Sequence, residues 1–151
     1  SAAAMPRVTE LGNSASKDVL PELVDRSFRR LARRVKQLEL EGPAEVWHEA
    51  RISAKRARYS AEAVSGVFGG PAKRLADALS EVTEILGDHQ DACIAQDVLR
   101  EMAATDGIDG RTGFALGLLH EHEFETELHN RLEFKRIWPH VRRVHKSTKL
   151  A

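Results

Sequence analysis

Residues 44–68 read AEVWHEARISAKRARYSAEAVSGVF, and this stretch decides the fold. Its apolar residues recur at intervals of three and four, the spacing of one face of an α-helix. That face consists of Trp47, Ala50, Ala54, Ala57, Ala61, Val64 and Phe68. Gly42-Pro43 before the stretch and Gly69-Gly70-Pro71 after it are breaking signals. The sequence therefore predicts one amphipathic helix, whose alanines allow a neighbouring helix to pack closely.

Three more helical segments are expected around this one. The first is predicted over 17–40, with Leu20, Leu23, Val24, Leu31, Val35 and Leu38 facing inward. The next runs from 71 to 103 through Gly87, where a kink stays open because glycine costs about 1 kcal/mol against alanine in a helix. The last covers 112–144, with Pro139 as a kink or break. Residues 121–127 alternate like a strand, but their Leu-, Ala- and Glu-rich flanks favour helix. Four long helices with short connections predict an all-α, antiparallel four-helix bundle.

Length and composition limit the class of protein. The chain has 151 residues, 42% of them hydrophobic and 30% charged, which suits one folded domain or lobe. Its one cysteine, Cys93, allows neither an internal disulfide nor a CxxC zinc site, and no apolar run is long enough to span a membrane. We expect a cytoplasmic protein with a disordered leader over 1–15, a helical lobe over 16–146 and a tail over 147–151. Ser1 to Ala4, before Met5, have the order of a cloning remnant.

The formal net charge is zero, yet the charges are segregated. Residues 26–36 carry six Arg or Lys residues and no acid, and residues 135–149 show the same imbalance. The stretch 77–133 holds fourteen acids against three bases, a balance of −11. A polyanion would be attracted to the basic stretches and repelled by the middle one.

A row of cations borders the apolar face of the 44–68 helix. His48, Arg51, Lys55 and Arg58 share one stripe there. Like charges at this spacing weaken an isolated helix, so the row suggests a counter-anion. Phosphate oxygens fit, because Arg holds them through two parallel hydrogen bonds, Lys acts as a point charge and His can switch its charge. The alternative is a solvated face with partners such as Glu62, and a His48 that only caps or packs.

Two motifs resemble a known family. The segment 48–62, HEARISAKRARYSAE, is similar to the second motif of CHAD domains, the conserved-histidine α-helical domains, which runs H-x-x-R-x-x-x-K-x-x-R-Y-x-x-E. The segment 86–92, LGDHQDA, resembles that family's Leu-Gly-x-x-Gln/Arg-Asp-Ala turn of helix. The two motifs fall in the family's order after a basic helix, and the resemblance covers about 17–140.

The resemblance implies an all-helical fold of two related four-helix lobes around a basic channel. It implies binding of inorganic polyphosphate, no established catalytic reaction and no cofactor. It also implies association with polyphosphate granules and, in many members, a triphosphate-tunnel domain in the same parent chain. The matching positions are His48, Arg51, Lys55 and Arg58, and the preceding helix adds Arg29, Arg30 and Arg33 as further polyphosphate-binding residues.

Only the second lobe of such a domain is present in the sequence. We therefore expect either a homodimer that rebuilds the channel or an N-terminal lobe supplied elsewhere. Two more residues have structural readings. Asp91 is expected to pair with an arginine such as Arg58, and His89 to be a core histidine rather than a ligand.

Three other functions fit the sequence less well than polyphosphate binding. Glu45-x-x-His48 has the spacing of di-iron bundles but lacks the second copy that such sites need, although His120, His122, Glu125 and His129 could hold a stray cation. Glu121-x-Glu123-x-Glu125 resembles a triphosphate-tunnel motif without its lysine. Nucleic-acid binding is disfavoured because Trp47, Trp138 and Tyr59 offer little stacking surface. The remaining alternative is a helical protein-interaction or metal-binding bundle with no polyanion ligand.

Overall fold

The computed structural model describes residues 21–148, apart from the side chain of Phe68. Residues 21–36 are helical, and α2 (Ala44–Phe68), α3 (Gly70–Ala103) and α4 (Gly110–Ser147) follow. Within 21–148 there is no strand, and residues 121–127 are helical, so the predicted all-α bundle is confirmed. The expected leader over 1–15 lies outside the described residues. None of the helices in 21–148 is both long and apolar enough to cross a bilayer.

Local chemistry explains where the helices stop. Gly69 separates α2 from α3 with φ +73°, a left-handed conformation that favours glycine, and its N–H donates to the carbonyl of Ser65. Asp109 caps α4 by accepting a hydrogen bond of 2.7 Å from the N–H of Thr112. Pro139 lies inside α4, which continues to Ser147, so no break occurs there. Helix α3 likewise runs through Gly87 without interruption.

The first helix is shorter than the sequence suggested. It was predicted to reach residue 40, but its last helical residue is Lys36. The carbonyls of the segment that follows are used by side chains of α4 instead. Lys135 Nζ donates to Leu38 O at 3.0 Å, and Arg131 NH1 donates to Leu40 O and Gly42 O at 2.9 and 2.8 Å. These tertiary contacts replace the next turn of helix.

The core lies where all four helices overlap. The 21–36 helix contributes Val24, Phe28, Leu31 and Val35, all buried. Phe28, which the sequence pattern missed, is 3% exposed and stacks on Trp138 and His145 with ring centroids 5.6 and 3.8 Å apart. Leu23, expected to face inward, is 40% exposed. The predicted alanine face of α2 is buried throughout its described side chains.

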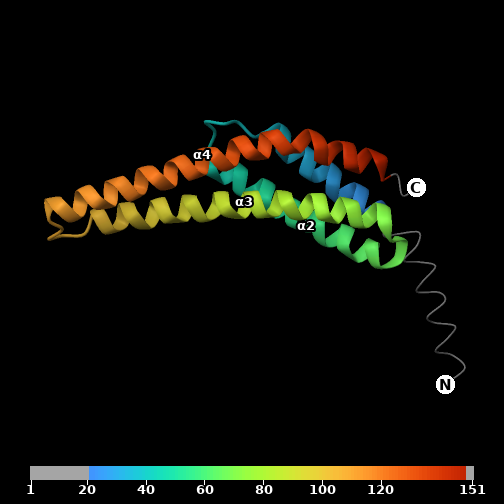
Figure 1. Cartoon of the computed structure of the whole chain (residues 1–151), viewed down its shortest axis with the longest axis horizontal. Helices are drawn as coiled ribbons and strands as arrows, with labels where there is room; N and C mark the ends of the chain where they lie inside the picture. Colours follow the sequence, from blue (N-terminus) through green and yellow to red (C-terminus); the bar gives the residue numbers. More distant parts are fainter. Residues whose placement is uncertain (1–20, 149–151) are drawn as a thin grey trace, which may run out of the picture.

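Beyond this body, α3 and α4 continue alone as a two-helix arm (Figure 1). We define the arm as residues 90–130, which lie between His89, stacked on Trp47, and Arg131, bonded to Gly42. Its loop, residues 104–109, falls between the helices predicted over 71–103 and 112–144. Many large apolar side chains on the arm are exposed, and Phe114 is 70% exposed. The bundle thus has four helices at one end and two at the other.

Candidate anion-binding site

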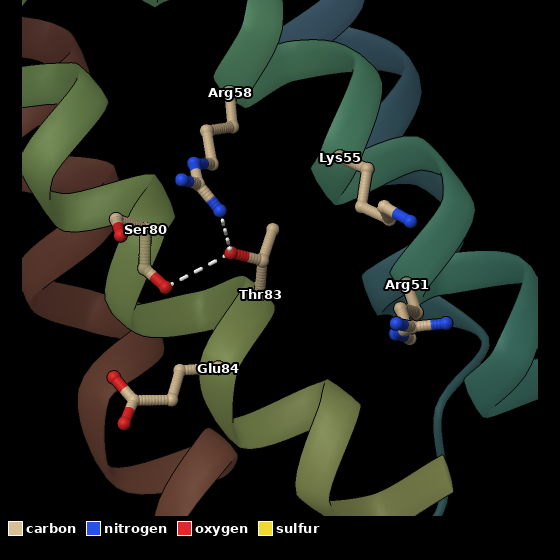
Figure 2. A pocket seen from close by; sticks show the side chains of 6 residues that line it. All are labelled: Arg51, Lys55, Arg58, Ser80, Thr83 and Glu84. Atoms are coloured by element: carbon tan, nitrogen blue, oxygen red, sulfur yellow. Dashed lines mark hydrogen bonds between the residues drawn. The ribbon is translucent and has the colours of Figure 1, made fainter.

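A cavity of about 310 Å³ opens between α2 and α3 (Figure 2). Helix α2 lines it with Arg51, Lys55 and Arg58, and α3 lines it with Ser80, Thr83 and Glu84. The cationic stripe meets α3 because it borders the buried alanine face that packs on the same helix. Three of the predicted binding residues therefore share one cavity.

Arg58 is held in a fixed position. Its Nε donates to Glu62 Oε1 at 2.8 Å, and its NH1 donates to Thr83 Oγ1 at 3.2 Å. Thr83 in turn donates to the carbonyl of Ser80 at 2.9 Å. The expected pairing of Arg58 with Asp91 is wrong, because Glu62 on the same helix and Thr83 take those places, and Asp91 is exposed. The guanidinium is thus oriented before any ligand arrives.

Arg51 and His48 each have one buried polar atom without a hydrogen-bond partner among the described residues. These atoms are Arg51 Nε and His48 Nδ1. Gly87 lies against this guanidinium, since a Cβ at that position would be 3.8 Å from Arg51 Nε and 3.9 Å from NH2. A buried N–H without a partner destabilises the fold by about 1–3 kcal/mol, and an acceptor oxygen would remove that penalty.

The charge in the cavity is mainly positive. Lys55 takes part in no ion pair among residues 21–148. Glu62 offsets Arg58. Glu84 lines the cavity, but Figure 2 shows its carboxylate pointing away from Lys55 and Arg51. Two cations therefore face the cavity without a paired acid from the described chain.

The other predicted arginines lie elsewhere. Arg29 pairs with Asp25 at 2.9 Å, while Arg30 and Arg33 are exposed on the 21–36 helix. None of the three lines the cavity. Their helix contacts α2 through an ion pair from Arg34 to Glu49 and a hydrogen bond between two serines, Ser27 and Ser60. Glu49 and Ser60 are on the flank of α2 opposite the stripe, so the 21–36 helix and the cationic stripe lie on different sides of α2.

His89 is a core histidine, as expected. It is 1% exposed, its ring stacks on Trp47 at 5.2 Å, and Nε2 accepts a hydrogen bond from Arg131 Nε at 3.0 Å. Burial, reinforced by the positive charge of Arg131, lowers the pKa of His89 to about 4. The ring is therefore neutral near pH 7 and serves Arg131 as an acceptor.

A metal ion does not fit the cluster around that histidine. His89, Cys93 and Glu127 place ligand atoms within 4.8 Å of one another, the only such group in the described part of the chain. Arg131 donates to both His89 and Glu127, so its charge stands where a cation would be repelled. Burial also raises the pKa of the Cys93 thiol to about 12, which disfavours the thiolate that metals bind. The Glu127 carboxylate already compensates Arg131.

The sequence did not point to Ser80, Thr83 or Glu84, and it marked Gly87 only as a possible kink and as part of the 86–92 motif. The first three lie three and four residues apart, and Gly87 continues the row, so they share one face of α3. Their types are too common for that row to indicate a site by itself. Only the packing of α3 against the α2 stripe gives these residues their place.

The chain is similar to known proteins over much of its length. A model of the CHAD domain family matches residues 2–100. Two uncharacterized proteins of Mycobacterium tuberculosis, MT2285 of strain CDC 1551 / Oshkosh and Rv2226 of strain ATCC 25618 / H37Rv, are each 27% identical over 124 residues. That alignment covers 77% of this chain and 23% of each relative, so the chain spans about a quarter of their length. No solved structure matches the chain.

Proposed function

The chain belongs to the CHAD domain family, and on that premise we propose that it binds inorganic polyphosphate between α2 and α3 and catalyses no reaction on it. One observation carries the proposal. Arg51, Lys55 and Arg58 line one cavity, and the buried Nε of Arg51 has no hydrogen-bond partner among the described residues. A phosphate oxygen is an acceptor of the required charge and size.

Each of the cationic side chains would contact the anion in a different way. Arg58, already oriented by Thr83 and Glu62, presents a fixed fork of donors to one phosphate. Lys55 adds a mobile point charge, and Arg51 gains the partner that it lacks. His48 is at the end of the stripe and does not line the cavity, and its buried Nδ1 has no partner among the described residues. Polyphosphate repeats one anionic group along a chain, so it can engage all of them in sequence.

A long polyphosphate would extend beyond the cavity. Arg29, Arg30 and Arg33 lie on the other flank of α2 and offer a second basic surface to the rest of such a chain. The relatives are about four times as long as the aligned part, which leaves room for an N-terminal lobe and a triphosphate-tunnel domain in a parent chain. Both remain part of the proposal, together with a cytoplasmic location at polyphosphate granules.

The test is a polyphosphate titration at several salt concentrations. Binding a polyanion releases counterions, so the logarithm of the association constant falls linearly with the logarithm of salt concentration. Lys55→Ala and Arg58→Ala should each weaken binding and reduce that slope by about one unit. His48→Ala should also weaken binding, because it removes one polar side chain from the stripe.

Lys73→Ala and Lys146→Ala are the matched controls. Both lysines are exposed and lie outside the cavity, so their removal should leave the slope close to that of the parent. Equal binding by the parent and the two cavity variants would reject the site. Equal affinity for RNA and for polyphosphate of the same charge would reject the ligand.

A further inference from the structure

Two helix surfaces outside the cavity carry complementary patterns. On the outer side of the 21–36 helix, one row of residues repeats at intervals of three and four. This basic seam consists of Leu23, Arg26, Arg30, Arg33 and Gln37. On the arm, a row of α4 repeats at the same intervals and is apolar at its ends and acidic in its middle. This acidic seam consists of Phe114, Leu118, Glu121, Glu125, Leu128 and Leu132.

Both seams face away from the core. The basic seam lies opposite Val24, Phe28 and Leu31, and its leucine and arginines are exposed. On the arm, Leu116 and Asn130 are buried toward α3, and the acidic seam is on the other side of α4. Its four apolar members are all exposed, with Leu118 at 58%. A row of large apolar side chains at coiled-coil spacing is typical of a surface that packs on another helix.

The two seams cannot meet within one molecule. The 21–36 helix packs on the C-terminal half of α4, where Phe28 stacks on Trp138 and Asp25 contacts His145 at 3.2 Å. The arm projects from the opposite end of the bundle (Figure 1). The basic seam of the same copy therefore cannot cover the acidic seam.

We propose that the partner is a second copy of this chain, and that the acidic seam of each copy docks along the basic seam of the other. Glu121 and Glu125 then face arginines of the row formed by Arg26, Arg30 and Arg33. Leu23 covers one apolar end of the acidic seam, and Gln37 lies at the other. The seams have compatible lengths, about 27 Å from 114 to 132 and about 21 Å from 23 to 37 at 1.5 Å per residue. Two reciprocal contacts close the assembly as a two-fold dimer.

Charge decides between this dimer and one in which two arms pair. Arm against arm would place the glutamates of both acidic seams together, which is destabilising. Arm against basic seam neutralises both surfaces. The contact also covers Arg30 and Arg33, so long polyphosphate and a docked arm compete for them, whereas the cavity between α2 and α3 stays open. The dimer does not depend on the proposed ligand.

Sedimentation equilibrium without polyphosphate tests the dimer. The parent should dimerise, and added salt should weaken the dimer because the contact is ionic. The double variant Glu121→Arg with Glu125→Arg should raise the dissociation constant at least about tenfold, as should Arg26→Glu with Arg30→Glu. Glu101→Arg with Asp106→Arg, which reverses two exposed charges of the arm outside the seam, should dimerise like the parent. Circular dichroism verifies that every variant keeps its helices.

Mixing the two weakened variants gives the decisive result. Each carries the complement of the other at both contacts, so a one-to-one mixture should form a heterodimer although neither variant dimerises alone. A parent that stays monomeric at all concentrations overturns the proposal, as does a mixture that stays monomeric. A basic-seam variant that dimerises like the parent would show that the arms pair with each other, which also overturns it.

Discussion

Arg131 carries a charge into the bundle, where its side chain meets five partners. It donates to His89, Glu127 and the carbonyls of Leu40 and Gly42, and its guanidinium lies 4.9 Å from the ring centroid of Trp47. Every donor direction but one is thus used, at 5% exposure. A buried cation is tolerated only when it is compensated this fully.

Replacing Arg131 with alanine should therefore destabilise the protein strongly. We expect a loss of about 3–5 kcal/mol in the free energy of unfolding, because Glu127 and two loop carbonyls lose their partner together. Urea unfolding followed by circular dichroism measures it. Arg136→Ala is the matched control, since that arginine is exposed and pairs only with Glu133. Equal unfolding midpoints for the two variants would contradict the role given to Arg131.

His89 should make stability depend on pH. Its pKa is lowered to about 4 in the folded protein but returns to about 6.5 on unfolding, so the unfolded chain binds the proton first. Stability is thus full above pH 6.5 and declines as the pH falls toward 4, by at most about 1 kcal/mol per pH unit. His89→Gln keeps an acceptor for Arg131 and removes this titration. The free energies of unfolding of the parent and of His89→Gln, measured from pH 7 to pH 4, should converge as the pH falls. A constant difference between them would contradict the prediction.

At this scale the sequence predicted what a single helix determines. The cavity row of Arg51, Lys55 and Arg58 follows from the helical repeat alone. The partner of Arg58 does not follow from the helical repeat, because Asp91 and Thr83 are both compatible with the spacing. Only the register of α3 against α2 determines which of them Arg58 contacts. For Arg131 the sequence indicated only one of three bases in the acidic stretch 77–133, since its loop partners are 89 and 91 residues away.

Helix α3 keeps a glycine in its interior where the guanidinium of Arg51 approaches. Gly87 lowers helix propensity by about 1 kcal/mol relative to alanine. A Cβ there would make ordinary contacts at 3.8 and 3.9 Å with Arg51, so a methyl group fits, and we expect a longer side chain to press on the guanidinium. The glycine thus permits the arginine to lie close to α3.

Two substitutions separate these effects. Gly87→Ala should raise the free energy of unfolding by about 1 kcal/mol and leave polyphosphate affinity unchanged. Gly87→Leu also favours helix, yet it should displace the Arg51 guanidinium and weaken binding several-fold. Thermal unfolding and titration of both variants provide the measurements. If Gly87→Leu binds polyphosphate as tightly as the parent does, the position of Arg51 is irrelevant to the anion.

The helices themselves were largely predictable. The bounds of α2 were predicted without error, because an apolar repeat ends at glycine-proline signals on both sides. The alternating stretch 121–127 was assigned correctly from its flanks. The end of the first helix was not predicted, because the carbonyls of Leu38, Leu40 and Gly42 accept hydrogen bonds from side chains of α4. A local sequence pattern does not indicate such distant donors.

The part of the chain that the structure describes, residues 21–148, consists of a four-helix body and a two-helix arm, with cationic side chains on two flanks of α2. The sequence predicted the segregation of charge but not the arm, since a bundle of equal helices has the same repeats. The proposed homodimer would use the arm as one side of its interface. Polyphosphate in the cavity and a second copy on the basic seam would occupy different sides of the same body.

The distances along the chain between contacting residues set an order of assembly. The arm closes through a six-residue loop over 104–109, whereas Lys135 and Leu38 are 97 residues apart and His145 and Asp25 are 120 apart. Contacts between residues close in the chain form fast, and contacts that close long loops form late. The α3–α4 hairpin should therefore form first, and the 21–36 helix should dock last and leave first. Contacts made after the rate-limiting barrier mainly slow unfolding, so Arg131 and Lys135 would lengthen the lifetime of the native state more than they speed its formation.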